Sequence, residues 1–288
     1  MKKALISGAG GQDGHYLAEV LERKNYKVFR TYRTTTLGIK LDISNFKELK
    51  RLISKIKPAL IFNFAARSDT SHKASQENSK TIVIGTVNLL EACLQLRSKA
   101  KIFIAGSGLQ FENRDKPIGK NDPLSFRSGY ACARNASLFY SRYYRGLGLK
   151  IYYGFLFNHE SALRSPFHLT QRLWRDAMRF KKGEIDKIDI IDDSVVKEWS
   201  HAYNTCELIY KFVTSPKPGE EIIGSGKGFS INQFVQKIFS THAIRYKGEV
   251  FKKTGQKAKY KKLISAPGRF KTQCGLARLL LDLQSANK

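Results

Sequence analysis

Three glycines at a spacing of three residues, Gly8, Gly11 and Gly14, constrain this chain more than any other feature. A short apolar run, Lys3–Ser7, precedes them and predicts a buried strand, and the amphipathic segment His15–Lys24 that follows predicts a helix. Glycine in such a turn permits the required dihedrals, close approach to a pyrophosphate and tight packing of helix on strand. The positive end of the helix then faces the phosphates. The motif predicts a dinucleotide-binding turn, and a plain glycine-rich turn is the alternative.

The first half of the chain continues as an alternation of apolar strands and amphipathic helices. Further strands are predicted at residues 26–32, 59–64, 101–105 and 150–155, and helices at residues 42–56, 82–96 and 129–145. This order predicts a parallel sheet with helices on both faces, joined by right-handed crossovers. The predicted fold class is α/β, a Rossmann doubly wound sheet with a smaller C-terminal substrate-binding lobe.

The regular alternation ends near residue 157. We expect residues 1–157 to form the dinucleotide-binding domain and residues 158–288 to form the substrate-binding lobe. Further helices are expected at residues 169–180 and 201–214, and a basic tail closes with residues 276–283. Because no repeat or linker-like stretch separates the two parts, we expect them to pack together and to interleave with the sheet near residues 200–225.

The end of the second strand decides which dinucleotide is expected. A site for NAD normally carries an acid there, about 20 residues beyond the glycines, that holds the ribose 2′-hydroxyl. Residues 28–36 contain no acid, whereas Arg33 can bind a 2′-phosphate through its guanidinium, so we predict NADP. Asp42 is a candidate acceptor for the adenine amino group, and its alternative role is to cap the helix that follows.

The net charge of +27 is unusual, with 51 basic and 24 acidic residues. Such a field attracts polyanions, but the basic excess is spread along the chain and carries no aromatic-interleaved motif. The densest stretch, Phe251–Lys262, is explained as a solvated lysine face or loop. We therefore expect no nucleic-acid partner, and polyanion binding stays an alternative hypothesis.

Cysteine spacing and apolar run length bear on compartment and metals. The four cysteines are scattered without C-x-x-C spacing, and the six histidines form no metal-binding pattern. This favours reduced thiols and no metal site. No apolar run approaches the roughly 18–20 residues that span a bilayer, and the N-terminal run is too short for a secretory signal. The expected location is the cytoplasm, without membrane contact.

Four stretches carry a resemblance to a known family: Gly8–Val20, Lys57–Asp69, Ser128–Ala136 and Leu156–Ser161. The chain resembles the extended short-chain dehydrogenases/reductases of the NAD-dependent epimerase/dehydratase family, and within them it is most similar to GDP-mannose 4,6-dehydratases. The first and last stretches are specific to that branch, whereas the third is general to the superfamily. A later run, 198–202 (EWSHA), is like the family's D-W-G-H-A.

The resemblance implies NADP-dependent oxidation at C4 of GDP-mannose, loss of water across C5–C6 and return of the hydride to C6. It places catalytic residues at Ser107 and Tyr130, with Arg134 in the lysine position, and substrate contacts at Asn158 and Arg164. The residues expected against the cofactor are Gly8, Gly11, Gln12, Asp13, Gly14, Arg33, Asp42, Ala65 and Ala66. The resemblance also implies a homodimer or homotetramer built on the helices at residues 82–96 and 129–145.

Two positions depart from the family pattern. The family's glutamate, two residues after Ser107, is Leu109, and its lysine is Arg134. Because residues i and i+4 share a helix face, Arg134 lies beside Tyr130 and keeps a positive charge there, so we expect C4 chemistry to be weakened and not abolished. Leucine cannot remove the C5 proton. The conceivable substitutes are Glu112, His159 and Glu160.

Three hypotheses follow for the activity of the chain. The first is an enzyme that acts on a GDP-hexose-like nucleotide sugar through C4 oxidation or reduction, either a divergent dehydratase or a C4 oxidoreductase. The second is a catalytically silent cofactor or nucleotide-sugar binder, and the third is a polyanion-binding protein on a Rossmann scaffold. Turnover of GDP-mannose with NADP separates the first two, and steep salt dependence of nucleic-acid binding would support the third.

Overall fold

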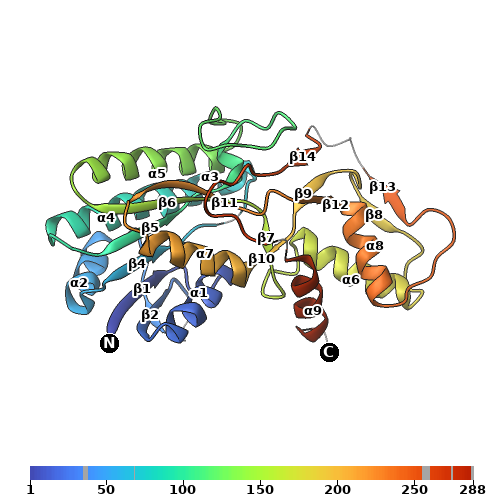
Figure 1. The fold of residues 1–288 in the computed structure, drawn as a ribbon, viewed down its shortest axis with the longest axis horizontal. Coiled ribbons are helices and arrows are strands. Elements are labelled where there is room, and N and C mark those ends of the chain that lie inside the picture. Colours follow the sequence, from blue (N-terminus) through green and yellow to red (C-terminus); the bar gives the residue numbers. More distant parts are fainter. Residues whose placement is uncertain (35–37, 68, 255–259, 274, 287–288) are drawn as a thin grey trace.

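A parallel β-sheet forms the centre of the larger part of the protein (Figure 1). The computed structural model describes residues 1–34, 38–67, 69–254, 260–273 and 275–286. Within these residues the sheet has seven strands in the order β11-β6-β5-β4-β1-β2-β3, and every neighbouring pair is parallel. The strands are β1 (Lys2–Ser7), β2 (Tyr26–Tyr32), β3 (Ile39–Lys40), β4 (Leu60–Asn63), β5 (Lys101–Ala105), β6 (Lys150–Leu156) and β11 (Gly219–Ile223). The predicted Rossmann α/β class is confirmed.

Successive residues of the central strands enter two different cores. In β1, Leu5 packs into one core while Ala4 and Ile6 pack into the other. In β5, Ile102 contributes to the first core and Phe103 to the second. Because side chains alternate across a strand, a strand buried on both faces needs a continuous apolar run, which is what the sequence provides.

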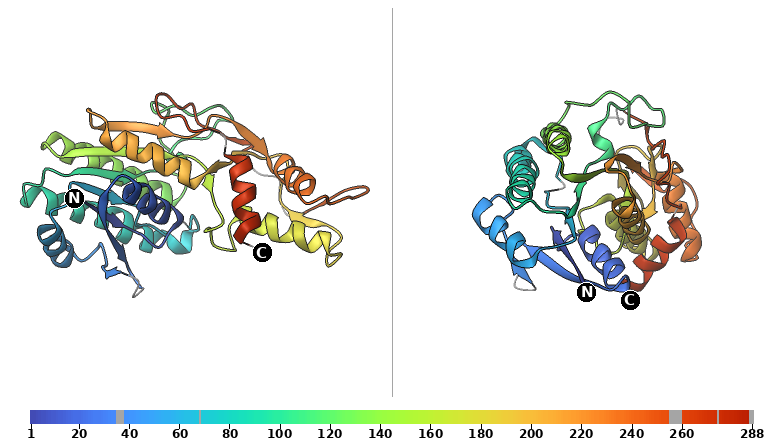
Figure 2. Two further views of the ribbon diagram at one scale, coloured as in Figure 1. Left: turned by 60° about the horizontal axis from the view of Figure 1, so that its bottom comes forward. Right: turned by 60° about the vertical axis from the view of Figure 1, so that its left-hand side comes forward.

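Helices cover both faces of the sheet (Figures 1 and 2). One face is covered by α1 (Gln12–Arg23) and α7 (Ala202–Thr214), and the other by α2 (Phe46–Ile56), α4 (Gly85–Gln95) and α5 (Gly129–Gly146). Short helical turns lie before α4 and after β5: η1 (His72–Ala74), α3 (Ser75–Asn78), the π-helical η2 (Ser79–Ile84) and η3 (Gly108–Gln110). The helix predicted at 82–96 is therefore a π-helical turn followed by an α-helix.

The helix predicted at residues 42–56 begins later, at Phe46, and its N-cap is Asn45, whose side chain accepts from the backbone N–H of Glu48. The alternative role for Asp42 as the cap of this helix is therefore wrong. Asp42 instead accepts from the backbone N–H and the hydroxyl of Ser44, at 2.9 and 2.7 Å.

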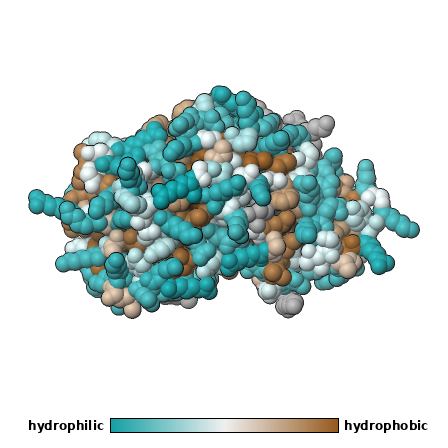
Figure 3. Space-filling view, viewed as in Figure 1, coloured by the Kyte–Doolittle hydropathy of each residue, from teal (hydrophilic) through white to brown (hydrophobic). Residues whose placement is uncertain are grey.

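A smaller lobe with its own apolar core lies beside the sheet (Figure 1). Trp199 and Phe234 stack face to face within this core, with ring centroids 4.0 Å apart. The lobe contains α6 (Leu169–Lys181), α8 (Ile231–Thr241), α9 (Leu276–Ala286), β7 (His159–Glu160), β8 (Ile188–Ile190), β9 (Val196–Glu198), β10 (Ser200–His201), β12 (Gly228–Ser230), β13 (Phe251–Lys253) and β14 (Lys262–Leu263). Hydrophilic side chains cover most of the face shown in Figure 3, and hydrophobic ones form smaller patches scattered among them.

The chain crosses between the two parts more than once. After β10 it returns to the sheet as α7 and β11, where Ile222 pairs with Phe155 of β6. The buried carboxylate of Glu198 then ties the lobe together, because it accepts from the hydroxyls of Ser225 and Ser265 at 3.0 and 2.6 Å. Among the described residues, none of the helices is both long enough and apolar enough to span a membrane.

Candidate functional site

Two adjoining cavities lie at the carboxyl ends of the parallel strands, where open α/β sheets bind their ligands. The Tyr130 cavity has a volume of about 310 Å³ and the Arg33 cavity about 530 Å³. Their shared walls are Gly8, Gly11, Phe64 and Ala66. The remaining predicted residues of the Tyr130 cavity are Gln12, Asp13, Gly14, Ser107, Tyr130, Arg134, Asn158 and Arg164, and those of the Arg33 cavity are Arg33, Asp42 and Ala65. The structure thus brings all of the predicted residues to one groove.

The glycine turn between β1 and α1 forms the floor of this groove. Gly8 has a φ of +80°, and a Cβ there would lie 2.7 Å from the backbone nitrogen of Ala65. A Cβ on Gly14 would lie 2.5 Å from the Cα of Ala9. Around Gly11, which caps α1, no atom comes closer than 3.7 Å to such a position. Gly8 and Gly14 therefore permit the fold, and Gly11 leaves the helix N-terminus open to a phosphate.

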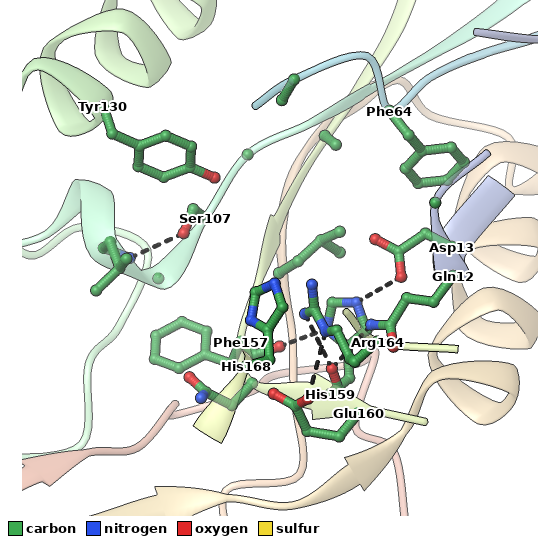
Figure 4. A pocket seen from close by; sticks show the side chains of 18 of the residues that line it. Gln12, Asp13, Phe64, Ser107, Tyr130, Phe157, His159, Glu160, Arg164 and His168 are labelled. Carbon is green, nitrogen blue, oxygen red and sulfur yellow. Dashed lines mark hydrogen bonds and ion pairs between the residues drawn. The ribbon is translucent and has the colours of Figure 1, made fainter. Parts of the chain in front are cut away.

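The two stretches that are most specific in sequence bind each other across this floor. The side-chain amide of Gln12 donates to the carbonyl oxygen of His159 at 2.9 Å and accepts from the hydroxyl of Ser161 at 2.8 Å. The Nε2 of His159 lies 2.8 Å from Oδ1 of Asp13. These residues are about 150 positions apart, so the contacts fix the lobe against the glycine turn (Figure 4).

Burial and pairing set the charges of this contact. Burial alone would raise the pKa of Asp13, but the adjacent His159 outweighs it and lowers that pKa to about 2. Burial alone would lower the pKa of His159, but the Asp13 carboxylate outweighs it and raises that pKa above 6.5. Arg164 lies near both groups and favours the ionised Asp13.

Tyr130 and Arg134 lie side by side on the first turns of α5. Ser128 caps this helix by accepting from the backbone N–H of Ala131 at 3.1 Å, which places Tyr130 at its second position. The Nε of Arg134 donates to the Tyr130 hydroxyl at 3.1 Å, and its Nη1 donates to the carbonyl oxygen of Ala105. Both side chains are buried, at 8% and 6% exposure, so the guanidinium charge acts on the hydroxyl with little water between them.

The loop after β5 lines the Tyr130 cavity on the same side as Tyr130 (Figure 4). The Ser107 hydroxyl accepts from the backbone N–H of Leu109 at 3.2 Å, and Gln110 closes the reciprocal bond to the Ser107 backbone at 2.8 Å. This capping box leaves the serine hydroxyl proton available to a ligand. Leu109 also lines the cavity and is 43% exposed, so an apolar side chain faces the cavity at the position that was predicted to depart from the family's glutamate.

The three conceivable substitutes for that carboxylate are all engaged elsewhere. Glu112 pairs with Arg114 at 2.8 Å and does not line the Tyr130 cavity. Glu160 and His159 do line it, but Glu160 lies 3.3 Å from the Nε of Arg164, and His159 is bound to Asp13 and to the carbonyl oxygen of Phe157. None of these three groups is therefore free at rest to take the place of that carboxylate.

Basic side chains from the lobe form a further wall of the Tyr130 cavity. Arg164 and Lys197 line it, together with His168, the residue before α6. Burial lowers the pKa of Lys197, and burial together with the nearby Arg164 lowers the pKa of His168, so the imidazole is neutral at neutral pH. Neither Lys197 nor His168 was predicted as a site residue, because neither belongs to a recognisable motif in the sequence.

The Arg33 cavity is lined by charged side chains of both signs. Arg33 pairs with Glu77 at 2.6 Å, and Arg67 pairs with the other oxygen of the same carboxylate at 2.6 Å. Asp42 faces this cavity with Lys80 3.7 Å away. Arg67 lies in a stretch used for the resemblance, yet its role was not predicted, because the pairing depends on Glu77 of α3. No group of three or more potential metal ligands is found among the described side chains.

Comparison with known proteins gives matches over nearly the whole chain. Residues 5–288 match the family model described as GDP-mannose 4,6 dehydratase. The GDP-mannose 4,6 dehydratase 2 of Arabidopsis thaliana is 29% identical over 278 residues, which cover 86% of this chain and 74% of the plant protein.

Two solved structures show the same fold at low sequence identity. The dTDP-glucose 4,6-dehydratase of Bacillus anthracis in complex with NAD has a TM-score of 0.81 at 18% identity, covering 99% of this chain and 97% of that one. The protein RMD of Pseudomonas aeruginosa complexed with NADPH has a TM-score of 0.86 at 14% identity, also covering 99% and 97%. Structural neighbours of this chain thus bind nicotinamide dinucleotides of both kinds.

Proposed function

Because the chain belongs to the GDP-mannose 4,6-dehydratase family, we propose that it uses NADP to oxidise or reduce a GDP-mannose-like nucleotide sugar at C4. The observation that carries this proposal is the buried Arg134 guanidinium, which donates to the Tyr130 hydroxyl inside the groove. The groove also fits a dinucleotide, because its glycine floor leaves space at Gly11 where a side chain would stand. When bound, the nicotinamide accepts or returns the hydride.

Tyr130 is the proposed base for the C4 hydroxyl proton. A tyrosine can accept a proton near neutral pH only when a nearby cation favours its ionised form. Arg134 supplies a permanent positive charge at hydrogen-bond distance. Ser107 lies on the same side of the cavity and holds the sugar hydroxyl through its free proton. Since Arg134 also holds the Ala105 carbonyl oxygen, it is less free than a lysine to follow the substrate, and we expect slow C4 chemistry.

Loss of water is the step we propose to be impaired. Removal of the C5 proton requires a base beside the sugar, and the residue at that place is Leu109. Without it, a C4 ketone forms and persists, or returns to an alcohol. The chain is then a C4 oxidoreductase on the scaffold of a dehydratase.

We propose that the lobe binds the nucleoside diphosphate part of the nucleotide-sugar substrate. Arg164 and Lys197 face the cavity from the lobe, and Asn158 follows β6 at its edge. Arg164 and Lys197 both lie near a single acid, Glu160, so the three side chains together carry excess positive charge that suits the diphosphate of a nucleotide sugar. This arrangement supports residues 158–288 as the substrate-binding part and a GDP-hexose-like substrate.

The test is incubation with NADP and a panel of GDP-sugars and other nucleotide sugars, followed by mass spectrometry. We expect a product that differs from its substrate by two hydrogens, with little or no loss of water. A silent nucleotide-sugar binder is the second candidate. It is favoured by the presence of Leu109 and Arg134 in place of the family's catalytic glutamate and lysine. Binding of a GDP-sugar by calorimetry without any product would decide for that candidate, and no binding at all would exclude both.

A further inference from the structure

Three charged side chains from separate parts of the chain meet in the Arg33 cavity. Glu77 of α3 accepts from Nη1 of Arg33 through one carboxylate oxygen and from Nη1 of Arg67 through the other, each at 2.6 Å. Arg33 directly follows β2, and Arg67 follows β4. One carboxylate thereby bridges the loops that follow β2 and β4, the two strands on either side of β1.

The bridge lies where the ribose of a bound dinucleotide is expected. The same cavity is lined by Gly10 and Gly11 of the glycine turn and by Asp42. The end of β2 carries no acid of its own, and of the two acids that line this cavity, Asp42 and Glu77, it is Glu77 that pairs with Arg33 and Arg67. The arginine side chains are 58% and 52% exposed and the Glu77 side chain 28%, so a ligand can reach all three.

A carboxylate between two guanidiniums makes the same charge-assisted hydrogen bonds as a phosphate does. A phosphate monoester carries about 1.5 to 2 negative charges at neutral pH and has three acceptor oxygens, so it competes well against one carboxylate. Hydrogen bonds from Arg67 and Arg33 keep Glu77 ionised, since they lower its pKa. The resting protein therefore holds its two arginines around an internal anion.

We propose that Glu77 is an internal stand-in for the 2′-phosphate of NADP, and that this phosphate displaces it from Arg33 and Arg67. Arg67 is then a second ligand of the 2′-phosphate, and Glu77 sets how strongly the site prefers NADP over NAD. NAD has no phosphate there and leaves the bridge intact, so only NADP binding has to break two ion pairs. The inference rests on the proposed function, because it requires a dinucleotide in this groove.

The experiment is a calorimetric titration of the full chain with NADPH and with NADH. In Glu77→Gln the arginines lose their internal anion, so NADPH should bind about 2- to 30-fold more tightly, as expected for the removal of two exposed ion pairs. NADH affinity should stay within a factor of two or so of the wild type. The matched control is Glu22→Gln. Glu22 of α1 pairs with Arg30 of β2 at 2.9 Å, and neither residue lines either of the two cavities.

The arginine variant supplies an independent arm. Arg67→Ala should weaken NADPH binding about 10- to 100-fold, the usual range for hydrogen bonds to a charged group, with little effect on NADH. The pair 2′,5′-ADP and 5′-AMP should show the same selectivity, since they differ only in the 2′-phosphate.

The outcomes separate the two proposals. If Glu77→Gln weakens NADH, Glu77 is a ribose ligand and the stand-in is wrong. If NADPH affinity does not rise in this variant, or if Arg67→Ala leaves it unchanged, the stand-in is also wrong, while the proposed function stands. Failure of the wild type to bind either dinucleotide would overturn both.

Discussion

The Nε of Arg134 lies 3.1 Å from the hydroxyl oxygen of Tyr130, one helical turn earlier in α5. The same guanidinium donates to the carbonyl oxygen of Ala105 at the end of β5, so it is anchored at both ends. An arginine at this position keeps the cation that a tyrosine base needs, but it holds that cation rigidly. This relationship predicts how the activity responds to substitution.

Replacing Arg134 by lysine should raise the rate of C4 oxidation about tenfold, equivalent to about 1.4 kcal/mol of barrier. The ammonium keeps the charge and is free to bind both the tyrosine and the cofactor ribose. Arg134→Gln, which removes the charge, should lower the rate about 100-fold or more. Single-turnover formation of NADPH measures both variants. A slower lysine variant with an unchanged melting temperature would show that the guanidinium itself is needed.

Replacing Leu109 by glutamate should permit loss of water while leaving C4 oxidation nearly unchanged. The side chain at this position already lines the Tyr130 cavity and is 43% exposed, so a carboxylate there reaches the sugar without being buried. A general base contributes about 10²–10⁴-fold, so a 4-keto-6-deoxy product should become readily detectable by mass spectrometry. Leu109→Gln is the matched control and should give no such product. An ordinary rate of dehydration by the wild type would show that another base acts.

The Asp13–His159 contact predicts how stability depends on pH. The lowered pKa of Asp13, about 2 against 3.8, gives stability that is complete above pH 3.8 and lost as the pH falls toward 2. The raised pKa of His159 gives stability that is complete below pH 6.5 and lost as the pH rises through the folded pKa. The contact is therefore strongest between these limits.

Denaturant unfolding of the wild type and of Asp13→Asn at about pH 5 and about pH 9 measures this dependence. The difference between the two proteins should be larger at the lower pH, because only there is His159 fully charged. Arg164 is near both groups and keeps its charge throughout, so it does not alter the sign. An equal difference at both values would mean that His159 does not titrate in this range.

The outer face of α5 predicts self-association. Phe139, Tyr143 and Leu147 follow one another at intervals of four residues, so they share a face, and they are 50%, 61% and 47% exposed. We expect a dimer at micromolar concentration in light scattering, and a monomer for the double variant Phe139→Asp with Tyr143→Asp. Leu281→Asp, at an exposed apolar position of α9, should leave the dimer intact. A monomeric wild type would refute the predicted assembly.

The sheet and the floor of the groove follow from local patterns in the sequence. The glycine spacing, the two-sided apolar strands and the Tyr130–Arg134 interval each depend on residues close together in the chain. The cap of α2 was harder to place, because both Asp42 and Asn45 are good capping residues and only the backbone path selects the second.

Features that depend on tertiary packing could not be predicted in the same way. The bridge of Arg33 and Arg67 through Glu77 joins loops that the sequence does not show to be neighbours. Lys197 faces the cavity because Glu198, the next residue, is held by the loops at Ser225 and Ser265. A single residue in an exposed or charged segment carries no periodic signal of such contacts.

Deuterium transfer tests the central claim most directly. The protein is incubated with NADP and GDP-mannose labelled with deuterium at C4, and the nucleotides are then separated and weighed by mass spectrometry. The account predicts label on the nicotinamide of NADPH for the wild type, and a rate at least about 100-fold lower for Tyr130→Phe, which lacks the base. Absence of transferred label from GDP-mannose and from every other C4-labelled nucleotide sugar, or equal transfer by Tyr130→Phe, would contradict it.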